Sequence, residues 1–226
     1  MIPLRDVIPS RTWPAVTVTL VALNVLVYLR QMGLADGEFE AFIRTFGLVP
    51  ASFAWTDVFS SMFVHGGLLH VVGNMLYLWI FGDNVEDRMG HGRFAVFYLL
   101  CGLTAALVQT AVSTESTVPM VGASGAIAGV MGAYFVLYPK SRVLTLFPFP
   151  LALIEIPAVY LLGLWFVMQF VNGLGSLAPA ADGQLAGGVA FWAHIAGFGA
   201  GGLLVFLFRR PERQRVEWWG GPGYDR

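Results

Sequence analysis

The stretch from Gly122 to Gly132, GASGAIAGVMG, places one hydroxyl side chain, Ser124, at the start of an apolar run. Later in the chain, the stretch from Ala193 to Gly201, AHIAGFGAG, places one imidazole, His194, in a similar position. A histidine that is neutral near pH 7 can accept the proton of a nearby hydroxyl and turn it into a nucleophile. If both runs are membrane helices, this pair suggests hydrolysis inside a membrane.

The composition places these runs in lipid. Hydrophobic residues make up 57% of the 226 residues and charged residues only 12%, far from the usage of soluble proteins. A helix needs about 20 mainly apolar residues to cross the hydrocarbon core. We therefore expect residues 1–226 to form a single domain, an all-α bundle of six transmembrane helices. The six segments lie at about 14–31, 60–82, 94–113, 122–138, 151–172 and 189–208.

The basic residues predict an orientation, because cytoplasmic loops collect Lys and Arg. The first run follows Arg5 and Arg11, as in a signal peptide, but it is long and lacks a convincing cleavage site, so we expect it to be retained. With the N-terminus inside, eleven basic residues fall on the inner side and two, Arg30 and Arg44, on the outer side. Both termini are therefore expected in the cytoplasm. The inner residues are Arg5, Arg11, Arg88, Arg93, Lys140, Arg142, Arg209, Arg210, Arg213, Arg215 and Arg226.

Several chemistries are disfavoured by the residues present. The net charge of −1 gives no indication of a nucleic-acid partner. Cys101 is the single cysteine, so no disulfide can form within the chain. Neither an H-E-x-x-H motif nor a pair of intramembrane aspartates occurs, which argues against zinc and aspartyl mechanisms.

Four polar residues are expected at one depth, because the second, fourth and sixth helices all run from outside to inside. His70 and Asn74 lie near the start of the second helix, Ser124 starts the fourth, and His194 lies about a turn into the sixth. Polar side chains inside a span are costly and are candidates for function. Each one alone is explained equally well by a hydrogen bond between helices. Four at one level favour a site near the outer face.

The residue types suit acyl transfer. Ser124 would be the nucleophile and His194 the base. A third residue to orient His194 is hard to find, because the acidic residues lie in loops, tails and inner helix ends, with only Glu115 and Asp182 in outer loops near the site. A Ser-His dyad is the simplest interpretation.

Donors for a developing oxyanion are also available. His70 and Asn74 are spaced i and i+4 and therefore share one helix face. Together with the Ser124 backbone N–H at a helix N-terminus, they could stabilise the oxyanion.

Glycines on the two helices favour a close approach. Gly125 and Gly129, and then Gly197 and Gly201, form small-xxx-small pairs. Generic packing explains such pairs equally well, but here they would let Ser124 and His194 meet. The G-x-S-G sequence is not the G-x-S-x-G elbow of α/β-hydrolases, which needs a strand before it.

Taken together, these motifs resemble the rhomboid intramembrane serine proteases. The resemblance implies a serine endopeptidase that cuts transmembrane proteins near the outer membrane face, with Ser124 and His194 as the dyad and His70 and Asn74 assisting the oxyanion. It implies protein substrates and lipids as partners and neither a metal nor a cofactor. We expect a multi-pass protein of the inner (cell) membrane of a prokaryote. The matching segments are HGGLLHVVGNM (65–75), Phe81-Gly82 with Glu86, GASGA (122–126) and AHIAGFGAG (193–201).

Two departures from the family pattern affect details. Trp55-Thr56 stands where many members carry Trp-Arg, and Ala128 stands where some members place a tyrosine beneath the histidine ring. Support for His194 must then come from elsewhere, such as a neighbouring aromatic ring or water. By resemblance, the fifth helix and the loop 173–188 could form a substrate gate, although packing explains its aromatic residues more simply.

Two other functions were weighed. A catalytically silent relative that binds transmembrane clients as a chaperone or adaptor would be marked by a lost serine or histidine, and both are present. A transporter would favour charged residues at the midplane and internal repeats, and neither is visible.

Overall fold

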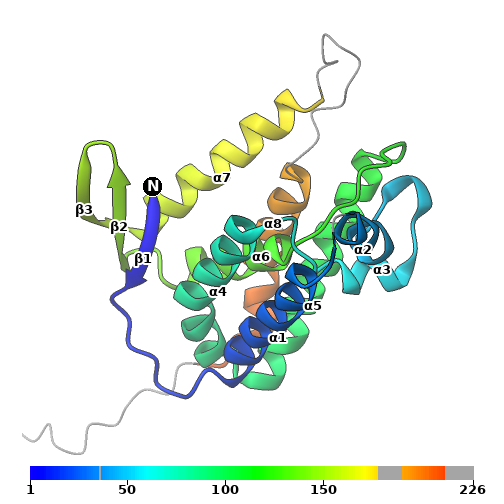
Figure 1. Cartoon of the computed structure of the whole chain (residues 1–226). Helices are drawn as coiled ribbons and strands as arrows, with labels where there is room; N and C mark the ends of the chain where they lie inside the picture. The colour runs from blue at the N-terminus through cyan, green and yellow to red at the C-terminus, as the bar shows by residue number, and fades with distance from the viewer. Residues whose placement is uncertain (36, 178–189, 212–226) are drawn as a thin grey trace, which may run out of the picture.

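The computed structural model of the protein describes residues 1–35, 37–177 and 190–211, and within these ranges the fold is mostly helical (Figure 1). Three strands are also present: β1 (Ile2–Asp6), β2 (Arg142–Pro148) and β3 (Leu151–Pro157). The helices are α1 (Ala15–Met32), α2 (Glu38–Phe46), α3 (Trp55–Ser60), α4 (Leu68–Met89), α5 (His91–Val112), α6 (Ser124–Leu137), α7 (Ala158–Gly175) and α8 (Phe191–Phe208), with a short 3-10 helix at Pro50–Ser52.

Four helices in the described ranges, α1, α5, α7 and α8, are long and apolar enough to cross a membrane. The chain is thus an integral membrane protein. Of the other expected spans, α6 has 14 residues, and the 22-residue α4 carries four charged side chains in its last turns. Each expected segment therefore contains a helix, while the count of six spans and the side on which the termini lie stay predictions. Asp182, Arg213, Arg215, Arg226 and most of the loop 173–188 fall outside the described residues.

Three expected boundaries are wrong. The second expected helix does not end at 82 but continues to Met89, because the charged residues after Gly82 end the apolar run without ending the helix. The second expected helix, 60–82, begins only at Leu68, because Gly66 and Gly67 interrupt the preceding segment and α3 has already ended at Ser60. The fifth, 151–172, begins only at Ala158, because residues 151–157 form β3 and end at Pro157, which has no backbone N–H and often starts a new helix.

The expectation of an all-α protein is wrong in the same region. The strands form a three-stranded antiparallel sheet in the order β1-β2-β3. β2 pairs with β3 along its whole length, and β1 pairs with β2 from Ile2 opposite Leu146 to Asp6 opposite Val143. The segment before α1 is thereby tied to the connection between α6 and α7. Figure 1 shows the sheet beside the start of α7.

The core is centred on α6. Every residue from Ala126 to Tyr134 is buried, and α6 contacts α4, α5, α7 and α8. The contact with α8 is between backbones: a Cβ added at Gly197 would overlap the carbonyl of Gly125, and one at Gly201 would overlap the carbonyl of Gly129. The two predicted glycine pairs thus lie in the contact between the helices that carry Ser124 and His194.

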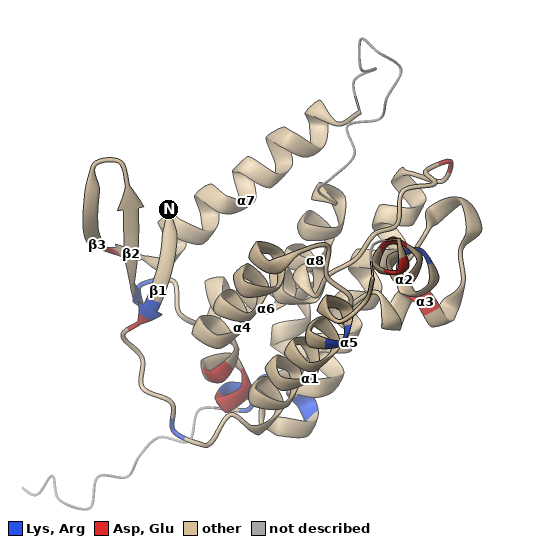
Figure 2. Cartoon of the chain, in the orientation of Figure 1, with Lys and Arg blue, Asp and Glu red and all other residues tan. Residues whose placement is uncertain are grey.

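Charged side chains are absent from α6, α7 and α8, and one group of acidic residues gathers where α4 ends beside the start of α1 (Figure 2). We call this region the acidic end of the bundle. Here the buried carboxylate of Glu86 accepts hydrogen bonds from the backbone N–H of Val16 (2.9 Å) and of Thr17 (2.8 Å). It also accepts one from the Thr17 hydroxyl (2.7 Å) and lies 2.5 Å from Nδ1 of His91. Glu86 thus caps the first turn of α1 from a neighbouring helix.

Asp6 of β1 joins the same end. Its carboxylate accepts hydrogen bonds from the Tyr134 hydroxyl (2.5 Å) and the Asn84 side-chain amide (2.9 Å). Burial raises the pKa of Asp6 from about 3.8 to about 6, an effect that the Tyr134 hydrogen bond only partly offsets.

Candidate active site

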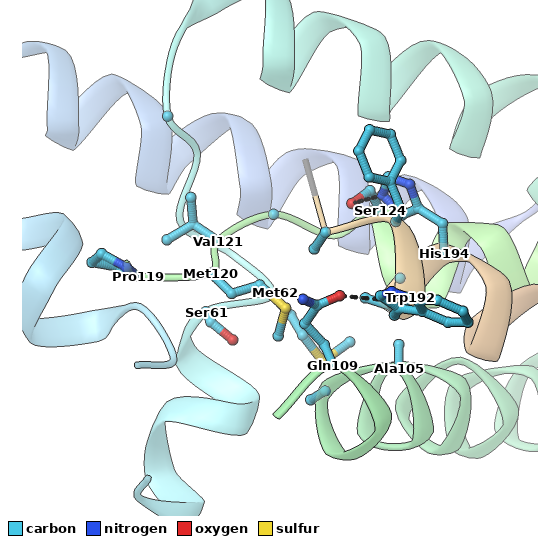
Figure 3. A pocket seen from close by; sticks show the side chains of 18 of the residues that line it. Ser61, Met62, Ala105, Gln109, Pro119, Met120, Val121, Ser124, Trp192 and His194 are labelled. Atoms are coloured by element: carbon cyan, nitrogen blue, oxygen red, sulfur yellow. Dashed lines mark hydrogen bonds between the residues drawn. The ribbon is translucent and has the colours of Figure 1, made fainter. Parts of the chain in front are cut away.

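Ser124 and His194 come together at the end of the bundle opposite to the acidic end, which we call the Ser124 end. Ser124 is the first residue of α6, and His194 lies in the first turn of α8. The Ser124 Oγ atom lies 2.8 Å from Nε2 of His194, a hydrogen-bond distance (Figure 3). With Nε2 unprotonated, the serine hydroxyl donates and the imidazole accepts.

The other nitrogen of the His194 ring faces α7. Nδ1 lies 2.8 Å from Oε1 of Gln169, and the Trp165 ring centre lies 5.8 Å from the imidazole centre. An Nδ1–H group that donates to Gln169 leaves the lone pair of Nε2 free for Ser124. The expected need for support other than Ala128 is thus met by an amide and an aromatic ring.

Sequence reasoning missed Gln169. A signal was present, because a glutamine inside an apolar span is costly and is a candidate for function. It belonged to no motif, and Asn172 on the same helix offered an equal amide. Glu115, by contrast, lines the cavity described below, while the hydrogen bond from His194 goes to Gln169. Asp182 lies outside the described residues.

His70 and Asn74 lie in the first two turns of α4 and point at the backbone just before Ser124. A Cβ added at Gly122 would fall 2.7 Å from Nε2 of His70 and 3.4 Å from Nδ2 of Asn74. Gly122 also has a φ of +115°, which side-chain-bearing residues rarely adopt. Glycine at this position therefore lets both side chains approach the start of α6.

His65 holds Asn74 from behind. The Asn74 amide nitrogen lies 2.9 Å from Nε2 of the fully buried His65, whose Nδ1 lies 3.3 Å from the carbonyl oxygen of Phe63. If Nδ1–H donates to Phe63, Nε2 accepts one Asn74 N–H and leaves the other for a ligand. Gln31 clamps the backbone of His65 through two hydrogen bonds of 2.9 and 3.1 Å. Through these bonds, His65 orders the loop before α4.

The start of α8 is fixed from α5. Oε1 of Gln109 accepts a hydrogen bond from the Ala193 backbone N–H (3.1 Å), and its Nε2 donates to the Ser113 hydroxyl (2.8 Å). Figure 3 shows Gln109 reaching toward α8 beside Trp192. Because Ala193 precedes His194, this bond satisfies a free donor of the first turn and holds the backbone that carries the imidazole.

A cavity of about 1180 Å³ opens beside the pair. Its wall includes Ser124, His194, His70 and Asn74, together with residues of α5, α7 and the segment before α6 (Figure 3). The first N–H groups of a helix have no partner inside the helix, and the start of α6 has no side-chain cap. The cavity therefore brings together a hydroxyl, a base, two side-chain donors and a helix N-terminus.

Comparison with known proteins gives a family match over most of the chain. Residues 52–211 match the family model described as a Rhomboid domain. The chain is 31% identical to RHOMBOID-like protein 5 of Arabidopsis thaliana over 168 residues, which cover 74% of this chain and 48% of that protein.

Two further relatives come from a bacterium and from human. Rhomboid protease GluP of Bacillus subtilis (strain 168) is 28% identical over 178 residues, covering 76% of this chain and 34% of that protein. The mitochondrial presenilin-associated rhomboid-like protein of Homo sapiens is 33% identical over 135 residues, covering 58% and 35%. The chain thus matches a third to a half of the length of these curated relatives.

Proposed function

The chain belongs to the rhomboid family, and we propose that it is an intramembrane serine endopeptidase that hydrolyses peptide bonds of transmembrane proteins near the outer membrane face. The observation that carries this proposal is the 2.8 Å contact between Ser124 Oγ and His194 Nε2 at the wall of a cavity. Residues 1–226 act as one membrane domain in this proposal.

In the proposed reaction, His194 takes the proton of the Ser124 hydroxyl as Oγ attacks the carbonyl carbon of the scissile bond. The tetrahedral intermediate collapses when the His194 imidazolium gives this proton to the leaving amine, which leaves an ester on Ser124. His194 then takes a proton from a water molecule that attacks the ester. Collapse releases the new carboxyl terminus and returns the proton to Ser124.

The negative charge on the carbonyl oxygen is assigned to three donors. His70 and Asn74 approach Gly122, which lies two residues before Ser124, whose backbone N–H is the third donor. Preorganised donors of this kind act strongly in a site of low dielectric, because they need no reorganisation as the charge develops. The bond from Asn74 to His65 supports this assignment by fixing the direction of the amide.

The outer location is part of the proposal. It rests on six spans with both termini in the cytoplasm, and on the inner membrane of a prokaryote as the site of action. The support is the distribution of basic residues, because Lys and Arg gather in cytoplasmic loops. A reporter fused after Arg226 is expected on the cytoplasmic side, and a tag near Gly183, outside the described residues, on the external side.

The alternative is a silent relative that binds transmembrane clients without cutting them. Of the three relatives above, one is named a protease and two are named rhomboid-like. A bonded Ser-His pair beside a cavity favours the protease, because binding alone needs neither an aligned hydroxyl nor a base.

The test uses the full chain in liposomes with single-pass reporters whose helices are weakened near the outer end. The wild type is expected to cut at one position, found by mass spectrometry, and Ser124→Ala is expected to leave the reporter intact. A fluorophosphonate provides a second readout that needs no substrate, and it should label the wild type and not Ser124→Ala. An unlabelled, folded wild type that still copurifies with reporters would favour the adaptor.

A further inference from the structure

We infer that Gln169 is a positioning residue for the Ser124-His194 pair, and that it makes the pair depend on the position of α7. The inference rests on the proposed function, since it assigns the group that prepares His194 as a base. The arrangement is a chain of two hydrogen bonds, with 2.8 Å between Ser124 Oγ and His194 Nε2 and 2.8 Å between His194 Nδ1 and Gln169 Oε1.

The chemistry follows from the two tautomers of a neutral imidazole. Only the tautomer with its proton on Nδ1 has a lone pair on Nε2 that can accept the Ser124 proton. A carbonyl oxygen can only accept, so Oε1 of Gln169 stabilises this tautomer and fixes the rotation of the ring. The same oxygen continues to accept from Nδ1–H when His194 carries a positive charge during the reaction.

An amide suits this location better than a carboxylate would. The helices α6, α7 and α8 contain no Asp, Glu, Lys or Arg, and the titratable neighbour of His194 from another helix is His70 of α4. An ionised carboxylate in such an apolar setting would carry a high desolvation cost, whereas a glutamine supplies an acceptor without a charge.

The helix that carries Gln169, α7, packs against its neighbours differently from α6 and α8. Backbone contacts between glycines join α6 to α8, but α7 meets α8 through side chains. Phe166 of α7 packs on Phe198 with ring centres 4.8 Å apart, and Trp165 and Phe170 make wider contacts with α8. Figure 1 shows α7 running at an angle away from the rest of the bundle.

The burial of α7 leads to the same conclusion. Its buried residues are Ala158, Leu161 and Leu162 near its start and Gly173 near its end, so the stretch 163–172, which includes the half-buried Gln169, contains no buried residue. Hydrogen bonds of this type have donor-acceptor distances of about 2.7 to 3.2 Å, so a shift of α7 by about 1 Å would break the Gln169 contact. The pair is then complete only while α7 is packed on α8.

The main experiment compares three variants of α7 in the full chain. Gln169→Leu removes the acceptor at similar size, and kcat should fall on the order of 10- to 100-fold with little change in KM, which is at or below the roughly 10²- to 10⁴-fold that a positioned general base contributes. Gln169→Glu keeps an oxygen acceptor and should recover most of kcat. Asn172→Leu is the matched control, since it removes an exposed amide from the same helix, and should stay within about twofold of the wild type.

A spectroscopic readout separates this inference from the proposed function. The chain has four histidines, so ¹⁵N-histidine spectra can be assigned with His194→Asn. His194 should carry its proton on Nδ1 in the wild type and in Ser124→Ala, and this preference should be lost in Gln169→Leu. A wild type that cuts no substrate, but whose His194 tautomer depends on Gln169, would contradict the proposed protease activity and still support the role of Gln169. A tautomer unchanged in Gln169→Leu, or a kcat equal to that of the wild type, would overturn it.

The dependence on α7 has its own test. Phe166→Ala loosens the packing on Phe198 without touching the pair, and should lower the rate at which a fluorophosphonate labels Ser124. If the packing acts through Gln169, the double variant with Gln169→Leu should label no more slowly than Gln169→Leu alone. Additive losses would show that α7 acts by another route. Should Gln169→Leu fail to fold, Gln169→Ala replaces it in both experiments.

Discussion

The Ser124 end and the acidic end of the bundle both bury polar side chains between helices, but their hydrogen bonds are arranged differently. At the acidic end, both oxygens of Glu86 are used, by the backbone of α1, the Thr17 hydroxyl and His91. At the Ser124 end, the bonds run from Gln169 through His194 to Ser124, and the Ser124 side chain lies at a cavity wall.

This difference in hydrogen bonding distinguishes a structural contact from a candidate site. Glu86 at one end and Asn74 and His194 at the other are hydrogen-bonded, as polar side chains between helices usually are. A carboxylate whose lone pairs are all occupied has no remaining capacity for a ligand. A hydroxyl whose oxygen faces a cavity can still react. Four sets of variants test this contrast, and we take them from the largest expected effect to the smallest.

The largest effect is expected for variants that remove the reacting atoms of the Ser124 end. Ser124→Ala, His194→Ala and the double variant should each lose activity on the order of 10⁴-fold or more, to the same level, because the two residues act as a unit. Initial rates on a reporter give the losses, and thermal unfolding in detergent should give the same midpoint as the wild type. Losses that add up in the double variant would mean that the two residues act separately.

Asn74 tests whether a residue of the Ser124 end is a tie or a donor, because its bond to His65 resembles those at the acidic end. As an oxyanion donor, Asn74→Ala should lower kcat on the order of 10²- to 10³-fold. The variant should still be labelled at Ser124 by a fluorophosphonate, more slowly, since the backbone donor remains. Wild-type turnover in a folded Asn74→Ala protein would reassign Asn74 as a structural residue, and His70→Ala can be judged by the same measurements.

Glu86 tests the other side of the comparison. Glu86→Ala leaves three donors of α1, the backbone N–H groups of Val16 and Thr17 and the Thr17 hydroxyl, without their acceptor, and should lower the free energy of unfolding by about 1 to 3 kcal/mol. Turnover per folded molecule should stay unchanged at a temperature where the variant is folded. Glu40→Ala, which removes an exposed carboxylate on α2, is the control. A slower variant with wild-type stability would show that the acidic end takes part in the chemistry.

The smallest effect is expected at Asp6. Because its pKa is raised to about 6, the folded protein keeps a proton between about pH 4 and 6 that the unfolded chain has released. This contribution to stability is fully present below about pH 4 and is lost as the pH rises through 6. The Asp6→Asn side chain cannot ionise. At pH 7 the free energy of unfolding of this variant should exceed that of the wild type by about 1 kcal/mol or less, and near pH 4 the two values should agree.

Thermal unfolding of both proteins between pH 4 and 8 measures this difference. A difference that stays constant over the whole range would show that the carboxyl group of Asp6 does not titrate as the structure indicates.

The sequence was sufficient for the parts of the fold that apolar length determines. Runs of apolar residues located the helices, and the shared depth of Ser124 and His194 anticipated their contact. Segment 151–157 was misassigned, because a short apolar run reads alike as strand or helix. Its strand depends on pairing with β2, and through β2 on residues 2–6, which local patterns do not reveal.

Gln169 illustrates a second limit. Most faces of α7 consist of apolar residues, so the periodicity of its sequence does not show which face meets α8. Gln169 and Asn172 were therefore equivalent in the sequence, and only the packing of α7 on α8 brings Gln169 to His194. The same limit applies to Glu86, whose partners lie on α1, far away along the chain.

The pairing of β1 with β2 also constrains how the chain is threaded through the lipid. Two strands can pair only on the same side of a membrane, so an even number of crossings must separate Asp6 from Arg142. β1 is synthesised before any of these crossings, whereas β2 is synthesised only after α6. The contact between the two strands therefore joins segments far apart in the sequence and forms late in assembly. A chain with one helix inserted the wrong way would leave β1 and β2 on opposite sides of the membrane. The sheet can therefore form only when an even number of crossings separates the two strands.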